Sequence, residues 1–332
     1  MPARKASAGD PSLDLDQQNA LIADFKDQTA STKEGSGSRV KTPKKSSIEI
    51  LRKRTADALA KTYEAGQQEL AFGISQWSSG RRGVPNPLIR GGLFSTKSSP
   101  VRQTFKSEKI ASLSTTNVTY SGEELRQTDL SAWMSIVNKG RDLPSGAPIQ
   151  FTAYELIKDM KWRIHSDSYA MLRDCIERLK FTSVKISTKD EKGAYAGSLI
   201  RDYAFDAVSD EGKPKWQVRL EPAIVSLFIN DQVTLLEWEQ RRQIGTKASL
   251  TLWLHTFYSS HRNPIPFQVA KLHELCRSED QRLSNFKVRL RRSLETLVDI
   301  NFLNAYQIKN DVVYVTRVAY PSGASEVPLL AQ

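Results

Sequence analysis

Residues 281–316 read QRLSNFKVRLRRSLETLVDINFLNAYQIKNDVVYVT, and this stretch decides the fold. Its first half places apolar residues at intervals of three and four, which predicts a helix from about Gln281 to Asp299 with one buried face. Its second half is rich in strand-forming residues on both sides of Asn310-Asp311, a pair that favours a tight turn, so we expect a β-hairpin over Phe302–Thr316. A helix followed at once by such a hairpin is typical of proteins that enter a DNA groove.

The same pattern occurs once more, earlier in the chain. It runs from Phe151 through Leu179 into the strand-like residues 181–220, and Thr152 with Glu155 has the spacing of a capping box that begins a helix. We therefore expect an α+β fold with two tandem winged-helix domains. The predicted boundaries are a disordered basic arm over 1–84, a first domain over 85–228, a second over 229–320 and a tail over 321–332.

The positive charge of the chain points to a polyanionic partner. The 332 residues carry a net charge of +11. Residues 1–113 hold 19 Lys and Arg against 11 Asp and Glu, residues 114–229 hold 16 of each, and residues 230–332 hold 13 against 10. Because the middle third is neutral, any affinity of that module for DNA must come from local placement of its basic residues.

The helix predicted near the C-terminus offers the clearest DNA-binding face. Its buried stripe is Leu283, Phe286, Leu290, Leu294 and Leu297. The predicted DNA contacts on its other side are Arg282, Asn285, Lys287, Arg289 and Arg292, with Lys309 on the hairpin for a phosphate or the minor groove. Arginine fits the acceptor pattern of guanine and asparagine that of adenine. The alternative is a charged face that is only solvated.

The matching helix of the first module begins near Ser166 or Asp167 and carries Asp167, Asp174 and Glu177 on its outer face. Since this face would repel phosphates, we expect DNA contacts at its N-terminal end and flanks, from Lys161, His165, Ser166, Ser168 and Arg173. The alternative is a helix that only packs. Three further contacts are predicted between the modules and ahead of the second helix, from His261, Arg262 and Ser278, although His261 would serve equally as a structural cap.

The sequence contains no motif that supports a catalytic or metal site. There is no phosphate-binding loop, and His273-Glu274 lacks the second histidine of a zinc protease helix. Cys175 and Cys276 each lie in an apolar helical pattern, which favours buried free thiols over a disulfide. We expect a protein that is not an enzyme, needs no cofactor or metal, has no membrane segment and is cytoplasmic.

One short segment of the arm suggests a protein partner. Gln67, Leu70 and Phe72 resemble the peptide by which bacterial proteins dock on the replication sliding clamp, where apolar side chains fill a pocket and Gln hydrogen-bonds beside it. The alternative is a helix end that packs Leu70 and Phe72 against the folded body.

From about Gln67 to Leu297, the chain resembles the TrfA-type plasmid replication initiators, a branch of the tandem winged-helix initiators. The resemblance rests on Pro85-Asn86, Leu93-Phe94, Val118-Thr119-Tyr120-Ser121-Gly122, Glu124-Leu125-Arg126, Phe151-Thr152, Tyr154-Glu155-Leu156, Arg178-Leu179, Trp238-Glu239 and, most specifically, Tyr258-Ser259-Ser260-His261-Arg262 with Pro264, Pro266, Cys276, Ser278 and Arg282.

This resemblance implies a protein that binds directly repeated iterons in a double-stranded plasmid origin, helps to open an adjacent AT-rich segment whose single strand is a further ligand, and recruits the host helicase, initiator and sliding clamp. It also implies a monomer–dimer equilibrium, for which Lys185–Leu220 is the candidate interface. A transcriptional repressor of the same architecture is the rival interpretation, and an inert architectural binder without site preference is a third.

Overall fold

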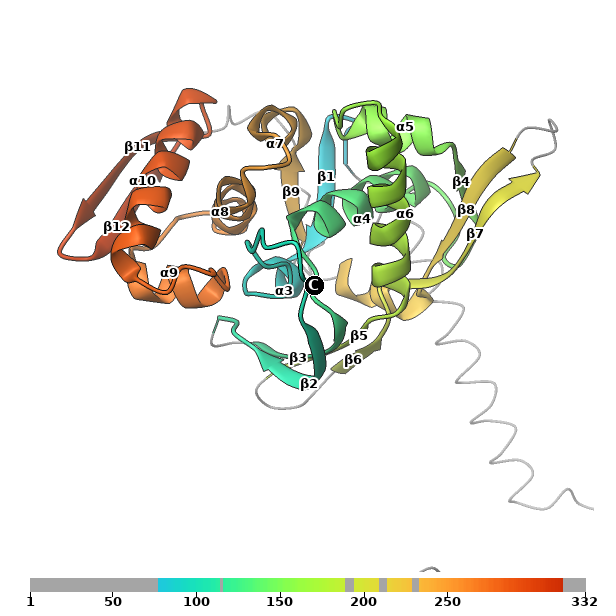
Figure 1. Cartoon of the computed structure of the whole chain (residues 1–332), viewed down its shortest axis with the longest axis horizontal. Helices are drawn as coiled ribbons and strands as arrows, with labels where there is room; N and C mark the ends of the chain where they lie inside the picture. Colours follow the sequence, from blue (N-terminus) through green and yellow to red (C-terminus); the bar gives the residue numbers. More distant parts are fainter. Residues whose placement is uncertain (1–76, 114–115, 189–193, 209–213, 229–232, 319–332) are drawn as a thin grey trace, which may run out of the picture. The chain divides into compact units, whose positions relative to one another are not determined.

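The computed structural model describes residues 77–113, 116–188, 194–208, 214–228 and 233–318. Helices and strands are mixed throughout these ranges (Figure 1). In chain order they are β1 (Arg81–Pro85), α3 (Asn86–Ile89), β2 (Thr104–Ile110), β3 (Thr116–Glu123), α4 (Gln127–Gly140), β4 (Ile149–Phe151), α5 (Ala153–Asp159), α6 (Ser166–Lys180), β5 (Ser183–Thr188), β6 (Ala194–Gly197), β7 (Ile200–Val208), β8 (Pro214–Leu220), the 3-10 helix η1 (Pro222–Phe228), β9 (Val233–Glu237), α7 (Trp238–Ile244), α8 (Ser249–Ser259), β10 (Phe267–Gln268), α9 (Val269–Leu275), α10 (Leu283–Asp299), β11 (Leu303–Lys309) and β12 (Val312–Arg317).

The predicted repetition of elements is present. The first copy is α4, β4, α5, α6 and the β7–β8 hairpin, whose three strands form a sheet in the order β4-β8-β7. The second copy is α8, β10, α9, α10 and the β11–β12 hairpin, with the sheet order β10-β12-β11. In both copies the short strand between the first two helices pairs antiparallel with the last strand of the hairpin. The long helix therefore lies beside a hairpin in each (Figure 1).

The sequence suggested a single hairpin over the strand-like region 181–220. The structure instead divides this region between two sheets. Strands β5 and β6 are inserted between the long helix and its hairpin, and they join a separate sheet in the order β2-β3-β5-β6. Strand β5 pairs with β3, with Val118 opposite Ile186 and Tyr120 opposite Val184. The alternating pattern is the same in both sheets, so only the available partner strand decides which sheet each segment enters.

The capping and turn chemistry behaves as predicted. Thr152 accepts a hydrogen bond from the Glu155 amide at 3.2 Å, and the Glu155 carboxylate accepts one from the Thr152 amide at 3.2 Å, so the capping box begins α5. Asn310 and Asp311 have φ angles of 50° and 61°. Two consecutive left-handed residues are what a two-residue hairpin turn requires, and Asn and Asp tolerate that conformation.

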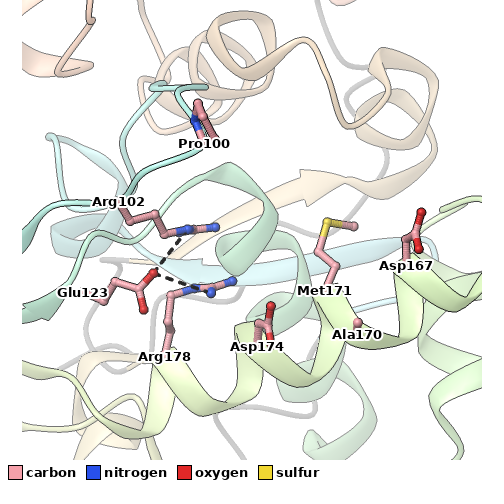
Figure 2. A pocket seen from close by; sticks show the side chains of 8 residues that line it. All are labelled: Pro100, Arg102, Glu123, Asp167, Ala170, Met171, Asp174 and Arg178. Atoms are coloured by element: carbon pink, nitrogen blue, oxygen red, sulfur yellow. Dashed lines mark ion pairs between the residues drawn. The ribbon is translucent and has the colours of Figure 1, made fainter.

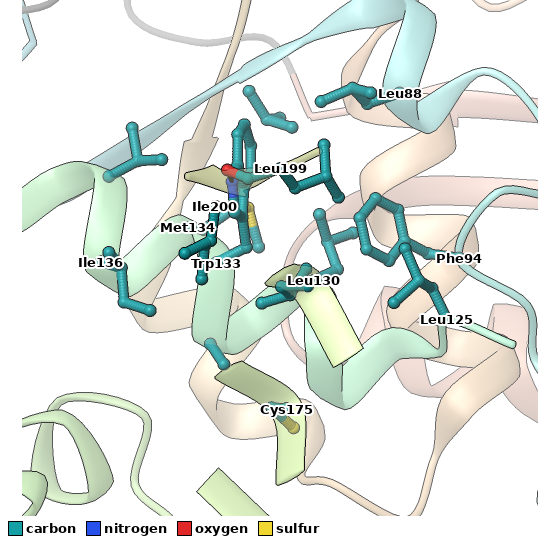
Figure 3. Packing of buried hydrophobic residues seen from close by; sticks show 14 of the residues in the cluster. Leu88, Phe94, Leu125, Leu130, Trp133, Met134, Ile136, Cys175, Leu199 and Ile200 are labelled. Atoms are coloured by element: carbon teal, nitrogen blue, oxygen red, sulfur yellow. Dashed lines mark hydrogen bonds between the residues drawn. The ribbon is translucent and has the colours of Figure 1, made fainter. Parts of the chain in front are cut away.

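Helix α4 is the centre of the first hydrophobic cluster and is buried on almost every side (Figure 3). Trp133, Met134 and Ile136 are each 0% exposed and point in different directions from the helix, which places apolar contacts all round it. The one buried carboxylate on α4 is satisfied at the same time: Asp129 accepts hydrogen bonds from Arg102 at 2.7 Å, from Arg178 at 3.0 Å and from the backbone amide of Arg126 at 2.7 Å.

A second cluster is built on α8, α9, α10 and the β11–β12 hairpin. The buried residues of the first cluster extend to Trp238, and those of the second begin at Ile244. Strand β9, which follows the predicted boundary at residues 228 and 229, pairs with β1, which precedes the first copy. The boundary itself stays a prediction. Cys175 and Cys276 are free and buried, one in each cluster.

Arg241 on α7 links the two clusters. It is 2% exposed, and its guanidinium donates to Gln127 Oε1 at 3.2 Å and Ser131 Oγ at 3.1 Å on α4, and to Leu252 O at 3.1 Å and Thr256 Oγ1 at 2.6 Å on α8. No carboxylate among the described residues forms an ion pair with it, so neutral acceptors alone stabilise the charge. Burial lowers the pKa of Arg241 to about 9, which leaves it protonated at neutral pH.

We predict that Arg241→Met lowers the free energy of unfolding by about 2 to 4 kcal/mol, because hydroxyl, amide and carbonyl acceptors on both helices lose their donor inside the protein. Urea denaturation measures this. The neighbouring Arg242, whose partner Glu239 is exposed, supplies the matched control: Arg242→Met is expected to cost under about 1 kcal/mol. Equal losses in the two variants would contradict the assigned role of Arg241.

His255 on α8 is a second buried polar group in this region. It is 0% exposed, its ring packs at a tilt of 47° against Phe302 with centroids 4.5 Å apart, and neither ring nitrogen has a hydrogen-bond partner among the described residues. Burial, followed by the positive charges of Arg241 and Arg317, lowers the pKa of His255 well below its ordinary value of 6.5. The folded protein therefore holds this histidine neutral.

A pH-dependent stability follows from this lowered pKa. Below about pH 6.5 the unfolded chain binds a proton at His255 that the folded chain does not, so stability is full above that pH and falls below it, by up to about 1.4 kcal/mol per pH unit. Urea denaturation between pH 7.5 and 5.5 is expected to show a shallower pH slope for His255→Leu than for the unmodified protein. An equal pH slope in the two proteins would contradict the conclusion that folding holds His255 neutral.

Candidate nucleic-acid interface

The outer face of α10 carries exposed basic side chains near its N-terminal half. The side chains of Arg282, Asn285, Arg291 and Arg292 are all exposed, and none of the three arginines forms an ion pair with a described residue. Arg291 was not among the predicted contacts, although the helical period alone would have placed it beside Arg292. The face therefore offers three unneutralised guanidinium groups and one carboxamide to a polyanion.

Arg289 and Ser278, both predicted DNA contacts, hydrogen-bond to Asp280 in the loop before α10. Arg289 Nη1 donates to Asp280 Oδ2 at 2.9 Å, and Ser278 Oγ donates to the same oxygen at 2.8 Å. His273 Nε2 lies 2.8 Å from the Asp280 carbonyl oxygen. Asp280, which sequence reasoning did not single out, is 13% exposed and fixes the loop that leads into α10. Arg289 and Ser278 therefore position the helix.

Lys287 is also engaged within the protein. Its Nζ lies 2.6 Å from Asp311 Oδ1, at the turn of the β11–β12 hairpin. This ion pair joins the helix to the tip of the hairpin, and Lys309, two residues before Asp311, remains exposed. The structure thus leaves Lys309 accessible on the hairpin, as the sequence suggested, and gives Lys287 a structural partner.

His261 follows α8 and is half-buried. Its Nδ1 lies 2.8 Å from the Phe257 carbonyl oxygen, and its ring packs on Phe257 and Phe267 with centroid distances of 4.7 and 5.7 Å. Burial lowers the pKa of His261 below its ordinary value. These contacts favour the alternative in which His261 is a structural cap, whereas the next residue, Arg262, is exposed.

The long helix of the first copy begins where the sequence predicted. The side chain of His165 accepts from the Asp167 amide and so caps α6, while Ser166 is exposed at the first turn. Ser168 is 8% exposed and faces the core, so it is unsuited to contact DNA. Of this group, Ser166 and His165 are the residues that an external ligand can reach.

The two basic residues predicted to flank this helix already have partners. Lys161 forms an ion pair with Glu239 of α7. The Arg173 guanidinium lies over the rings of Phe205 and Trp216, 4.2 and 5.4 Å from their centroids, which are on the β7–β8 hairpin. Arg173 therefore anchors the hairpin to α6 through cation–π contacts.

A cleft of about 470 Å³ runs beside the outer face of α6 (Figure 2). Asp167, Met171 and Asp174 line it from the helix, and Pro100 and Arg102 face them from the segment before β2. Glu123 lies between Arg102 and Arg178, with N–O distances of 3.7 and 3.8 Å. Both arginines also bind Asp129, so their charge is neutralised internally. What this cleft presents to solvent is largely carboxylate, as expected from the sequence.

Three of the expectations rest on segments that are wholly or mostly not described. Gln67, Leu70 and Phe72, the proposed clamp peptide, lie outside the described residues, and so do the tail over 321–332 and residues 1–76 of the predicted disordered arm. The predicted end of that arm at residue 84 is wrong, because Trp77 and Val84 are buried and β1 begins at Arg81. Within the described ranges, no helix has the length and apolar character needed to cross a membrane. The same ranges contain no group of three or more His, Cys, Asp or Glu side chains arranged to hold a metal ion.

Comparison with known proteins agrees with the resemblance found in the sequence. The family described as TrfA protein matches residues 45–317. The plasmid replication initiator protein TrfA of Escherichia coli is 27% identical over 329 residues, which is 96% of this chain and 83% of that protein. Among solved structures, domains 2 and 3 of RctB superpose with a TM-score of 0.47 at 11% identity, covering 70% of this chain and 99% of theirs. Because the family match runs through both copies of the repeated arrangement and most of the sequence, this chain belongs to the TrfA family.

Proposed function

We propose that this protein is a plasmid replication initiator that binds directly repeated iterons at its origin. The observation that carries the proposal is the exposed basic face of α10 in a chain that belongs to the TrfA family. On this proposal the protein binds the repeats, promotes the opening of neighbouring AT-rich DNA and recruits the host helicase, initiator and sliding clamp. It acts through binding energy and catalyses no reaction.

The topology of the two copies supports an assignment as tandem winged helices. In that architecture the last helix before the hairpin enters the major groove with its N-terminal residues on base edges, and the hairpin contacts the adjacent backbone or minor groove. In the second copy these elements are α10 and the β11–β12 hairpin, and the ion pair between Lys287 and Asp311 holds them together.

The two modules contribute unequally on this proposal. The second supplies Arg282, Asn285 and Arg292 for base and phosphate contacts, while the acidic surface beside α6 in the first module limits its contacts to the helix N-terminus around Ser166. On this proposal the first module positions the protein on the DNA and the second reads the base sequence. Together the two modules would span about two helical turns of DNA. Repeats of roughly 20 base pairs fit this arrangement.

Opening of the origin follows from accumulated deformation. Protomers on adjacent repeats bend the DNA, and the bending energy is relieved at flexible AT-rich steps, whose separated strand is then a further ligand. A monomer–dimer equilibrium through the region 185–220 would limit the amount of active protein. Support for that interface is the pair of edge strands β6 and β7, which lie at the ends of their sheets.

The central prediction compares two arginines on the same helix. Arg292→Ala is expected to weaken binding to a repeat duplex by about 1 to 3 kcal/mol while leaving thermal stability unchanged, because Arg292 is exposed and forms no ion pair with a described residue. Arg289→Ala is expected to lower the free energy of unfolding by about 1 kcal/mol, because Asp280 loses its cation. Gel-shift titration and thermal melting of both variants give the two readouts.

If Arg292→Ala binds the repeats as tightly as the unmodified protein, α10 is not the reading helix. The repressor alternative is separated by a replication assay. A plasmid that carries only the origin should be maintained when the unmodified protein is supplied in trans and lost with the Arg292→Ala variant. Repeat binding without any maintenance of the plasmid would favour the repressor.

A separate prediction concerns the clamp peptide. Leu70→Ala combined with Phe72→Ala is expected to abolish pull-down of the sliding clamp and reduce replication while repeat affinity stays the same, since such a peptide binds through two or three apolar anchors. If these residues instead pack on the folded body, the double variant will melt at a lower temperature and retain its clamp signal, which would exclude docking through this segment.

A further inference from the structure

Val288 is an apolar side chain at the centre of the polar face of α10. It is 47% exposed, although it lies on a 17-residue helix that buries Phe286, Leu290 and Leu294. At about 100° per residue, Leu290 is roughly 200° around the helix from Val288, so the two side chains point to opposite sides. Val288 therefore points away from the buried face of α10.

The neighbours of Val288 are the groups proposed to contact DNA. Asn285 lies three residues before it and Arg292 four residues after it, and residues at these spacings share one helix face. Arg291 lies on the other flank and is also exposed. Val288 is the sixth residue of α10, within the first two turns, which is where recognition helices meet base edges.

The chemistry of the Val288 side chain limits which groups of DNA it can recognise. Valine offers no donor or acceptor, so it gains nothing from phosphates or from the hydrogen-bonding edges of bases. The apolar group that the major groove presents is the 5-methyl of thymine, and aliphatic side chains recognise it by contact. A β-branched residue also gains no helix propensity from an exposed position, so local helix stability does not account for it.

We infer that Val288 is a specificity-determining residue that recognises the 5-methyl group of a thymine in the repeat, beside an adenine contacted by Asn285 and a guanine contacted by Arg292. This inference rests on the proposed function and deepens it by naming a base feature that the helix reads. The ligand is double-stranded DNA with at least one thymine methyl facing α10.

The test removes the methyl group from the DNA and the isopropyl group from the protein, separately and together. A duplex carrying one repeat from the cognate origin is made with each thymine replaced in turn by deoxyuridine, which differs only by the missing methyl. Affinities are measured for the full-length protein, for Val288→Ala and for Val101→Ala. Val101, which is 76% exposed and lies outside α10, provides the matched control.

When deoxyuridine replaces thymine at one position, the unmodified protein and Val101→Ala are each expected to bind the duplex about fourfold more weakly. This is the effect of no longer burying one methyl group, about 0.8 kcal/mol. Val288→Ala is expected to bind the thymine duplex about fourfold more weakly than the unmodified protein and to be insensitive to uridine at that position. Its thermal stability should be unchanged, since alanine favours the helix.

Two results would overturn the inference while leaving the proposed function intact: specific repeat binding that is insensitive to uridine at every position, or a uridine effect of the same size in Val288→Ala. Failure of the proposed function is seen differently. In that case the unmodified protein does not prefer the repeat duplex over a scrambled duplex of the same composition, and the inference about Val288 falls with it.

Discussion

The arrangement of the described residues depends on the guanidinium of Arg241. It lies between α4 and α8, the first helices of the two copies, and donates hydrogen bonds to both. A buried charge without a carboxylate partner is costly unless its donors are satisfied, so the acceptors on the two helices must stay in place for the charge to be stabilised. The orientation of one copy against the other is thereby restricted by a single side chain.

Further contacts join the second copy to the segment that precedes the first copy. The indole of Trp253 donates to the Gly91 carbonyl oxygen at 3.2 Å, and Thr96 donates through its hydroxyl to Cys276 O at 3.1 Å. The Arg277 guanidinium lies 4.3 Å from the centroid of the Phe105 ring. A DNA-binding protein with two modules gains from such rigidity, because ordering that is complete before binding is not an added cost at the moment of binding.

The distribution of partners among the basic residues separates positioning from recognition. Arg289, Lys287, Lys161 and Arg173 each have a carboxylate or aromatic partner within the protein, and each joins the helix region to a loop, a hairpin or a neighbouring helix. Arg282, Arg291 and Arg292 have no ion-pair partner among the described residues. These three supply the charge that the proposed interface needs. The four basic residues with internal partners hold the helices, loop and hairpin in position.

Local patterns in the sequence determined the elements themselves. The three- and four-residue spacing predicted α10 within two residues of its start, Thr152 with Glu155 predicted the beginning of α5, and Asn310-Asp311 predicted the hairpin turn, because each depends on neighbours in the chain. Tertiary structure alone decided the pairing of β5 with β3 and the hydrogen bonds that Arg289 and Ser278 donate to Asp280. A strand pattern does not specify its partner, and an arginine on a helix shows its charge in the sequence but not the carboxylate that folding brings to it.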